Sequence, residues 1–156
     1  MSFTLRPLTL DDAEAVAALY QQSAAYLRAL GDDTDFQFSA QVYRRDGFGP
    51  QAAFAGLGAV LDEHLVGYLL YNFGYDTDRA MRYLCVLDLL VDEAHRRKGI
   101  GQALMQHVAV ICRAAGGQEL CWAVYAKNEA ALRFYHRLGA EEIADLRYMR
   151  LAIQKP

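Results

Sequence analysis

Apolar residues recur at the spacing of one helical face in three stretches of the chain. Thr9 precedes the first stretch and Asn128 precedes the last, and both residue types are favoured N-caps. Glycine follows each stretch, as it commonly does where a helix ends. The pattern therefore predicts helices at residues 9–30, 100–115 and 128–138, with a further short helix at 39–45.

The apolar runs between these stretches predict strands. Residues 3–8 alternate and include Pro7, which favours the edge of a sheet. The segment Asp62-Glu63-His64 separates two apolar runs and predicts a hairpin between them. The order of elements indicates the α/β (α+β) class, a mixed sheet with helices on its faces. Strands are expected at residues 3–8, 52–61, 65–75, 82–91 and 120–126, and one or two more at 141–153.

Length and composition limit the kind of protein. A chain of 156 residues, 54% of them hydrophobic, is the size of one domain with a sizeable core, so a single domain is expected at residues 1–156. The formal net charge of −3 argues against nucleic acid as a partner. The sequence shows no secretory leader pattern and no apolar run long enough to span a bilayer. We therefore expect a cytoplasmic protein with no membrane partner.

The cysteines and histidines carry no metal-site pattern. Cys85, Cys112 and Cys121 are widely separated in apolar surroundings, so they are expected to be core thiols rather than disulfide partners or zinc ligands. None of the four histidines joins a metal-spaced set. The sequence therefore implies no metal.

The segment HRRKGIG, residues 95–101, lies between a predicted strand and a predicted helix. The first backbone N–H groups of a helix have no partner within it, and the helix dipole attracts anions to that end. Gly99 and Gly101 lack a Cβ, which allows a ligand to approach the backbone closely. Three cations at residues 96–98 add positive charge. The segment therefore indicates a site for several phosphates.

Two common nucleotide motifs do not fit this segment. No Gly-x-x-x-x-Gly-Lys-Ser/Thr string occurs, which excludes a P-loop. A dinucleotide-binding fingerprint needs a third glycine where Leu104 stands, and Glu119 precedes its strand instead of ending it. A tight turn with a solvated basic face is the alternative interpretation.

A second motif makes the phosphate site the better interpretation. Arg96-x-x-Gly99-x-Gly101 is followed by Asn128-x-x-Ala131-x-x-x-Tyr135-x-x-x-Gly139. Together the two motifs resemble the acetyl-CoA-binding core of the GNAT superfamily of N-acetyltransferases, over residues 65–145. The resemblance implies a single GNAT domain with a mostly antiparallel central sheet of six to seven strands. In that fold the sheet is splayed at its fourth strand and flanked by about four helices.

The resemblance also implies where acetyl-CoA would bind as the acetyl donor. In GNAT enzymes the backbone amides of the first motif hold the pyrophosphate, and the splayed fourth strand binds the pantetheine arm through its backbone. The asparagine and tyrosine of the second motif lie near the thioester. The cofactor-binding residues implied here are Leu89, Leu90, Val91, Arg96, Arg97, Lys98, Gly99, Ile100, Gly101, Gln102, Asn128, Ala131 and Tyr135.

Acetyl transfer from a thioester to an amine requires a deprotonated amine and a proton for the departing thiolate. The resemblance gives Tyr135 the role of proton donor, and a tyrosine packed in the core is the alternative. Asp88 is the candidate base or amine anchor. Strand alternation puts Asp88 on the face opposite Leu89 and Val91 unless a bulge re-aims it. A structural carboxylate at Asp88, with a water chain taking the proton, is the alternative.

Three segments, residues 67–76, 83–91 and 134–140, resemble the diamine and polyamine branch of the superfamily, the spermidine/spermine and thialysine N-acetyltransferases. Asp76 and Asp88 match acidic positions of that branch, where a carboxylate would attract a cationic amine. Tyr26 in the first predicted helix is a candidate for the substrate wall. The branch carries a Glu-Asp pair where this chain has Leu87-Asp88, so the identity of the base stays open.

These observations predict an N-acetyltransferase that acts on a primary amine of a small molecule, such as a diamine, polyamine or lysine analogue. Direct attack in a ternary complex is expected, because no Cys or Ser is paired with a base in a recognisable motif. A protein or peptide N-acetyltransferase and a non-catalytic acyl-CoA-binding regulatory module are the alternatives. The resembling branch also implies a homodimer.

Overall fold

The computed structural model describes residues 2–153, and its strands form one sheet in the order β1-β2-β3-β4-β5. Neighbouring strands are antiparallel except β4 and β5, which run parallel. The mixed, mostly antiparallel α/β class that the sequence predicts is therefore confirmed. The strands are β1 (Thr4–Pro7), β2 (Ala55–Leu61), β3 (His64–Asp76), β4 (Met81–Val91) and β5 (Gly117–Cys121).

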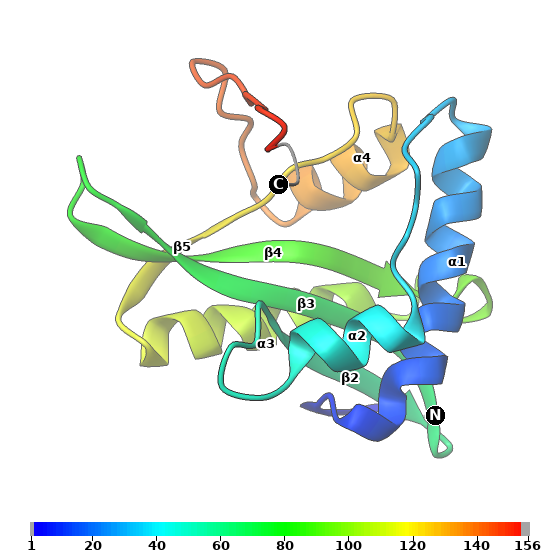
Figure 1. Cartoon of the computed structure of the whole chain (residues 1–156). Helices are drawn as coiled ribbons and strands as arrows, with labels where there is room; N and C mark the ends of the chain where they lie inside the picture. Colours follow the sequence, from blue (N-terminus) through cyan, green and yellow to red (C-terminus); the bar gives the residue numbers. More distant parts are fainter. Residues whose placement is uncertain (1, 154–156) are drawn as a thin grey trace.

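Helices cover both faces of this sheet (Figure 1). On one face, Leu104 and Val108 of α3 are buried against β2, β3 and β4. On the other face, Val16 of α1 and Tyr43 of α2 pack against Leu90 and its neighbours. No helix formed by residues 2–153 combines the length and the apolar character needed to span a bilayer. The helices are η1 (Leu10–Asp12), α1 (Ala13–Ala29), α2 (Ala40–Gly47), η2 (Glu93–His95), α3 (Ile100–Ala114) and α4 (Glu129–Arg137).

Two hairpins build the centre of the sheet. The β2–β3 turn forms at Asp62 and Glu63, whose φ angles of 48° and 65° are typical of a two-residue type I′ turn. β3 and β4 form a longer hairpin that ends at the pair Asp76 and Met81. In Figure 1 the tip of this second hairpin extends away from α1 and α4.

Two strand predictions near the carboxyl end of the chain are wrong. β5 occupies Gly117–Cys121, so the strand expected at 120–126 begins earlier and ends sooner. Residues 141–153 form no strand, and Tyr148 among them is 92% exposed. A strand needs a neighbouring strand and a buried face, and this segment has neither within the described chain. The described sheet therefore has five strands instead of six or seven.

β4 and β5 separate part-way along their length. They pair over Arg82–Cys85 of β4 and diverge after that point. From Val86 to Val91, β3 is the only strand that pairs with β4 among residues 2–153. This is the splay that the GNAT resemblance predicts, and it opens at the end of β4 that points toward α1 (Figure 1).

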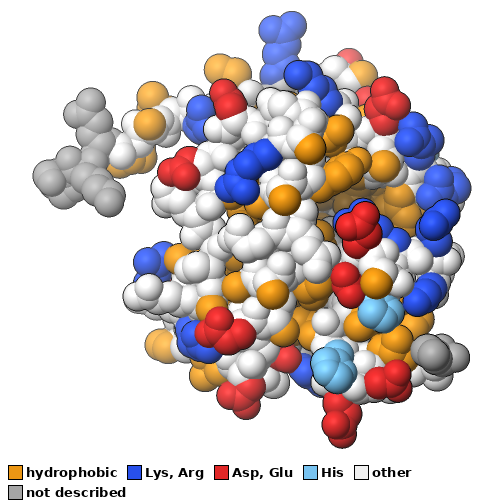
Figure 2. Space-filling view, turned by 90° about the vertical axis from the view of Figure 1, so that its right-hand side faces the viewer, with side chains coloured by type: hydrophobic (Ala, Val, Ile, Leu, Met, Phe, Trp, Pro, Cys, Tyr) orange, Lys and Arg blue, Asp and Glu red, His pale blue; other side chains and the backbone are white. Residues whose placement is uncertain are grey.

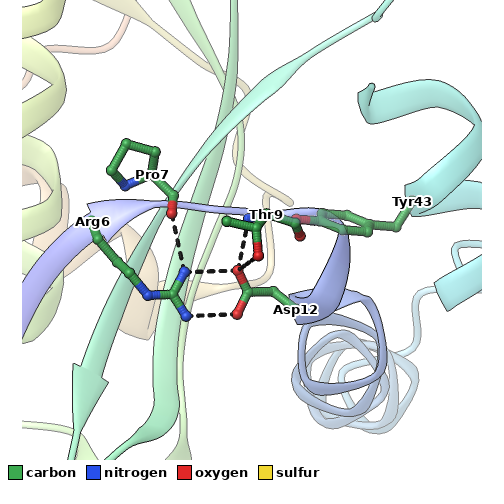
Figure 3. Close-up of polar contacts among 5 residues, drawn as sticks. All are labelled: Arg6, Pro7, Thr9, Asp12 and Tyr43. Atoms are coloured by element: carbon green, nitrogen blue, oxygen red, sulfur yellow. Dashed lines mark hydrogen bonds and ion pairs between the residues drawn. The ribbon is translucent and has the colours of Figure 1, made fainter. Parts of the chain in front are cut away.

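A polar network fixes the start of α1 (Figure 3). Arg6 donates two hydrogen bonds to the Asp12 carboxylate, at 2.8 and 2.7 Å, and the Thr9 backbone N–H donates a third at 2.7 Å. The Tyr43 hydroxyl of α2 donates to the Thr9 carbonyl at 2.8 Å. The hydrogen bonds from Arg6 above all, and those from Thr9, lower the pKa of the buried Asp12. The network joins β1, α1 and α2. It fixes the position of α1, which forms one side of the candidate site.

Candidate active site

A cleft of about 690 Å³ opens between α1, α4, the start of α3 and the end of β4. Figure 2 shows the molecule from its α1 side, where hydrophobic side chains line a hollow and Lys and Arg side chains lie along the adjacent edge. The volume is in the range of small-molecule and cofactor sites. All of the predicted cofactor-binding residues except Lys98 line this cleft.

The amino terminus of α3 forms one part of the cleft. Gly99 is the N-cap of α3 and has a φ of 81°, a left-handed conformation that favours glycine. A Cβ at Gly101 would lie 3.2 Å from the ring of Phe134, so glycine allows α4 to pack close to α3. The unpaired amides of this first helical turn and the helix dipole make this part of the cleft attractive to anions.

The cations of residues 96–98 point to different places. Arg96 lines the cleft, and its Nε donates to the Val91 carbonyl at 3.2 Å. Arg97 also lines the cleft. Lys98 does not, and its Nζ donates to the Ala94 carbonyl at 3.2 Å. Two of the three predicted cations therefore contribute charge to the cleft directly.

Asn128 joins the two walls of the cleft. Its Oδ1 accepts a hydrogen bond from the Ala131 backbone N–H at 3.1 Å, which caps the start of α4. The same oxygen accepts from the hydroxyl of Tyr26 on α1 at 3.4 Å. The positions of α1 and α4 on either side of the cleft are thus linked through one atom.

Tyr135 lines the cleft from α4. Its ring centroid lies 4.8 Å from that of Trp122 and 5.1 Å from that of Phe134. Burial, with a smaller contribution from the negative charge of Asp88, raises the pKa of Tyr135 to about 12. The hydroxyl therefore keeps its proton at neutral pH and is available as a donor.

A β-bulge immediately precedes Asp88 on β4. Leu70 of β3 pairs with Asp88, while the next residue, Tyr71, pairs with Val86. Leu87 is therefore the extra residue, and its side chain is 46% exposed. The bulge precedes Asp88, and pairing from Asp88 to Val91 is regular, so Asp88 lies on the face opposite Leu89 and Val91, as strand alternation predicts.

The bulge determines which face of the sheet Asp88 occupies. Val86, before the bulge, packs in the core with α3, whereas Leu90, after it, packs with α1 and α2. Asp88 lies two residues from Leu90 and shares its face. The charge of Asp88 contributes to the raised pKa values of Tyr20 on α1 and Tyr135 on α4. Asp88 therefore acts electrostatically on both walls of the site.

A buried phenol holds one oxygen of the Asp88 carboxylate. The Tyr68 hydroxyl donates to Asp88 Oδ2 at 2.5 Å. Burial raises the pKa of Asp88, and hydrogen bonds from Tyr68 and from the Leu89 backbone oppose that rise. No cation among residues 2–153 forms an ion pair with this carboxylate. A half-buried carboxylate without a cationic partner can receive a cationic ligand.

Asp76 lies apart from this group. It ends β3 at the tip of the long hairpin, where its Oδ1 accepts from the Arg79 backbone N–H at 3.0 Å. The cleft lies at the opposite end of that hairpin. Of the three predicted substrate-binding residues, only Tyr26 lines the cleft. Asp88 directly precedes the lining residue Leu89 but does not line the cleft itself, and Asp76 lies away from it.

Sequence reasoning did not single out Tyr68. It stands in an apolar run like any core aromatic residue, and its contact with Asp88 depends on the register of β3 against β4. Ser23, three residues before Tyr26 on α1 and likewise a candidate for the substrate wall from the sequence, also lines the cleft.

The described residues offer no metal site. No group of three or more His, Cys, Asp or Glu side chains among residues 2–153 is arranged to hold a metal ion. Cys112 is buried, Cys85 and Cys121 are partly buried, and all three are free thiols.

Comparison with known proteins identifies the family. Residues 14–140 match the model of the acetyltransferase (GNAT) family, a span that contains every residue lining the cleft. The chain belongs to the GNAT family. This GNAT protein is an enzyme that acts as an N-acetyltransferase, and its family uses acetyl-CoA as a cosubstrate.

Curated relatives of this GNAT protein act on amines. The bovine thialysine N-epsilon-acetyltransferase is 29% identical over 142 residues, which cover 86% of this chain and 81% of the relative. The L-ornithine N5-acetyltransferase of Arabidopsis thaliana is 30% identical over 90 residues, or 58% of this chain and 40% of the relative. The GNAT protein thus shares most of its length with the first of these enzymes.

Solved structures share its fold. An integron cassette protein from V. cholerae superposes with a TM-score of 0.79 at 25% identity, covering 97% of this chain and 93% of that one. The ribosomal-protein-alanine N-acetyltransferase of Brucella melitensis gives a TM-score of 0.77 at 21% identity, with coverage of 97% and 100%. The second likeness is one of fold alone.

Proposed function

We propose that this GNAT protein transfers the acetyl group of acetyl-CoA to a primary amine of a small molecule, such as a diamine, polyamine or lysine analogue. The observation that carries the proposal is one cleft with two chemically different parts. The amino terminus of α3 suits a phosphorylated donor, and the Tyr135–Asp88 region suits a cationic amine.

The chemistry of the cleft supports acetyl-CoA as the ligand. The amides at residues 99–102, with Arg96 and Arg97, would hold its phosphates. The backbone of Leu89–Val91, which lacks a strand partner on the β5 side, would take the amide groups of the pantetheine arm as a neighbouring strand would. A pantetheine arm placed in this way would end at the gap between β4 and β5.

Direct attack in a ternary complex accounts for the transfer. The substrate ammonium first loses one proton, for which Asp88 is the candidate acceptor. The amine nitrogen then attacks the thioester carbonyl, the C–N bond forms, the C–S bond breaks, and the nitrogen releases a second proton. Tyr135 donates a proton to the departing thiolate and regains one from solvent. A backbone N–H near Val91 would stabilise the oxyanion.

A small amine is favoured over a protein substrate. The similarity extends over most of the chain to enzymes named for thialysine, and over a shorter part to one named for ornithine, both of which are small cationic amines. A protein or peptide N-acetyltransferase is the second candidate, supported only by a likeness of fold. Retention of Tyr135 argues against a non-catalytic acyl-CoA-binding regulatory module.

We also propose that two copies of the chain associate, and that they work in the cytoplasm, where free thiols such as these persist. The outer edge of β5 has no partner strand among residues 2–153 and would accept one from a second copy. Exposed apolar segments mark association surfaces. Six large apolar side chains near the carboxyl end are more than half exposed: Ile143, Leu146, Tyr148, Met149, Leu151 and Ile153.

Light scattering on the full chain and on a chain that ends at Ala140 tests the association. We expect a dimer for the full chain and a monomer for the shorter one. A monomeric full chain at micromolar concentration would disprove the association.

Acetyl-CoA-dependent thiol release against a panel of amines tests the activity. The panel contains spermidine, spermine, short diamines, lysine, thialysine, ornithine and a lysine-containing peptide. We expect turnover with small diamines or lysine analogues and little with the peptide. Turnover with the peptide alone would favour the second candidate, whereas tight acetyl-CoA binding without any turnover would favour the binding module.

A further inference from the structure

Tyr68 and Asp88 are hydrogen-bond partners in the interior of the protein. The Tyr68 side chain is fully buried, and its hydroxyl donates to Asp88 Oδ2. Burying a hydroxyl without a hydrogen-bond partner costs free energy, so Tyr68 needs an acceptor at this place. Asp88 has no cationic partner in the described chain, so it needs a donor. Without the Tyr68 hydroxyl, Asp88 would keep only the Leu89 backbone as a donor, and without an acceptor at position 88 the Tyr68 hydroxyl would be left unsatisfied.

Strand register makes this contact. Tyr68 pairs with Leu90, so Asp88 is its diagonal neighbour on the same face of the sheet. If β4 continued regularly from its start, without the bulge at Leu87, Asp88 would pair with Leu69, whose side chain lies in the core with α3. The bulge therefore delivers the carboxylate to Tyr68.

Three tyrosines from three elements lie close enough to be affected by the charge of the carboxylate: Tyr20 of α1, Tyr68 of β3 and Tyr135 of α4. The charge of Asp88 contributes to the raised pKa of each. The ring of Tyr20 is itself 5.2 Å from that of Phe38, measured between centroids. Aromatic rings around a carboxylate without a cationic partner are a favourable environment for an ammonium group.

We propose that Tyr68 is a positioning residue: by donating to Oδ2 it holds Asp88 as a carboxylate whose other oxygen receives the substrate ammonium and accepts its proton. The proposal rests on the proposed function and deepens it. It assigns the role of base to Asp88, held by Tyr68, in a chain that has a leucine at position 87. One proton passes from nitrogen to oxygen, which leaves a neutral amine and a carboxylic acid. The acid returns its proton to solvent after the product leaves.

Tyr68→Phe tests the proposal, since it removes the hydroxyl and keeps the ring. The hydrogen bond favours the ionised form of Asp88, so its loss raises the pKa of that carboxyl. The low-pH limb of kcat/KM then moves to higher pH, and we expect kcat/KM at pH 7 to fall about tenfold. The Kd for acetyl-CoA stays unchanged, because Tyr68 does not line the cleft.

Tyr71→Phe is the matched control. It removes a phenol from the same strand, but the Tyr71 ring packs with the α3 core on the opposite face of the sheet. Burial alone raises the pKa of Tyr71. We expect this variant to keep the wild-type pH profile.

A measurement without amine separates this inference from the proposed function. Carboxyl ¹³C NMR follows the titration of Asp88 in the wild type and in Tyr68→Phe, with Asp88→Asn identifying the signal. We expect a higher midpoint in Tyr68→Phe, and an unchanged midpoint overturns the inference even if the wild type acetylates no amine on the panel. A raised midpoint with an unchanged pH profile of kcat/KM overturns the role of Asp88 as base.

Discussion

Gly99 and Gly116 stand at opposite ends of α3 with nearly the same backbone angle, φ of 81° and 79°. A Cβ at either position would meet no atom within 4 Å. Alanine therefore imposes a similar left-handed strain at both, about 1–2 kcal/mol, without a steric clash. The two positions differ in that only Gly99 lines the cleft.

This equivalence gives a controlled test of the cosubstrate site. We expect Gly99→Ala and Gly116→Ala to lower Tm to a similar extent. Only Gly99→Ala should weaken acetyl-CoA binding, by about tenfold or roughly 1.4 kcal/mol, because it shifts the amides at the start of α3. Calorimetric titration measures the affinity. Equal affinities in the two variants would contradict phosphate binding at this helix terminus.

Tyr135→Phe tests the proton donor. We expect kcat to fall about 10²-fold, within the range for acid–base groups, while the Kd for acetyl-CoA stays near the wild-type value. The pKa of about 12 keeps Tyr135 protonated below pH 11, so its titration does not limit the rate there. Tyr83→Phe, in the part of β4 far from the cleft, is the control. A wild-type kcat in Tyr135→Phe would rule out the donor role.

Asn128 Oδ1 has two roles, capping α4 and accepting from Tyr26 across the cleft, and two variants distinguish them. Asn128→Ala removes the N-cap bond of α4 and the contact with Tyr26, so we expect a loss of about 1 kcal/mol in stability. Tyr26→Phe removes only the contact across the cleft. Chemical denaturation should therefore detect the first variant and not the second, while both should weaken acetyl-CoA binding. A stable Asn128→Ala protein would disprove the capping role.

The Asp12 network predicts how stability depends on pH. The folded-state pKa of Asp12 is lowered, so its contribution is present above the unfolded value near 4 and is lost as the pH falls through the folded value. We expect Asp12→Asn to cost about 1–2 kcal/mol at pH 7 and to flatten the loss of stability between about pH 5 and pH 2. Urea unfolding across that range measures both effects.

Asp46→Asn is the control for this experiment. Asp46 pairs with Arg45 at 2.7 Å, and both side chains are exposed. Exposed ion pairs contribute little to stability, so this variant should follow the wild-type curve. If Asp12→Asn also followed the wild-type curve, the network would have no energetic role.

Local signals account for what the sequence predicts well. Ser39 and Asn128 cap their helices through hydrogen bonds to residues three positions on, which lie within the same short segment. The Asp62-Glu63 turn is equally local. The glycine-containing turn at residues 96–101 is a contiguous motif, so the sequence locates that part of the cleft with its neighbouring residues.

Non-local pairing accounts for what the sequence predicts poorly. The apolar pattern at 141–153 suits a strand, but the described chain gives it no neighbour. The direction of Asp88 depends on a single extra residue, Leu87, and the relevance of Tyr68 depends on the same register. Periodicity along one strand contains no information about a bulge, because the bulge is a relation between two strands.

Where β4 and β5 diverge, the end of β4 has no partner strand on its β5 side among the described residues, so it is an unpaired strand edge that faces the cleft. Exposed edges invite pairing with other chains and are a common origin of aggregation. Leu89–Val91 lies in the cleft that residues of α1 and α4 also line, so these helices flank the unpaired edge and shield it from other chains. The helices that shape the cleft therefore also protect the empty enzyme from sticking to itself.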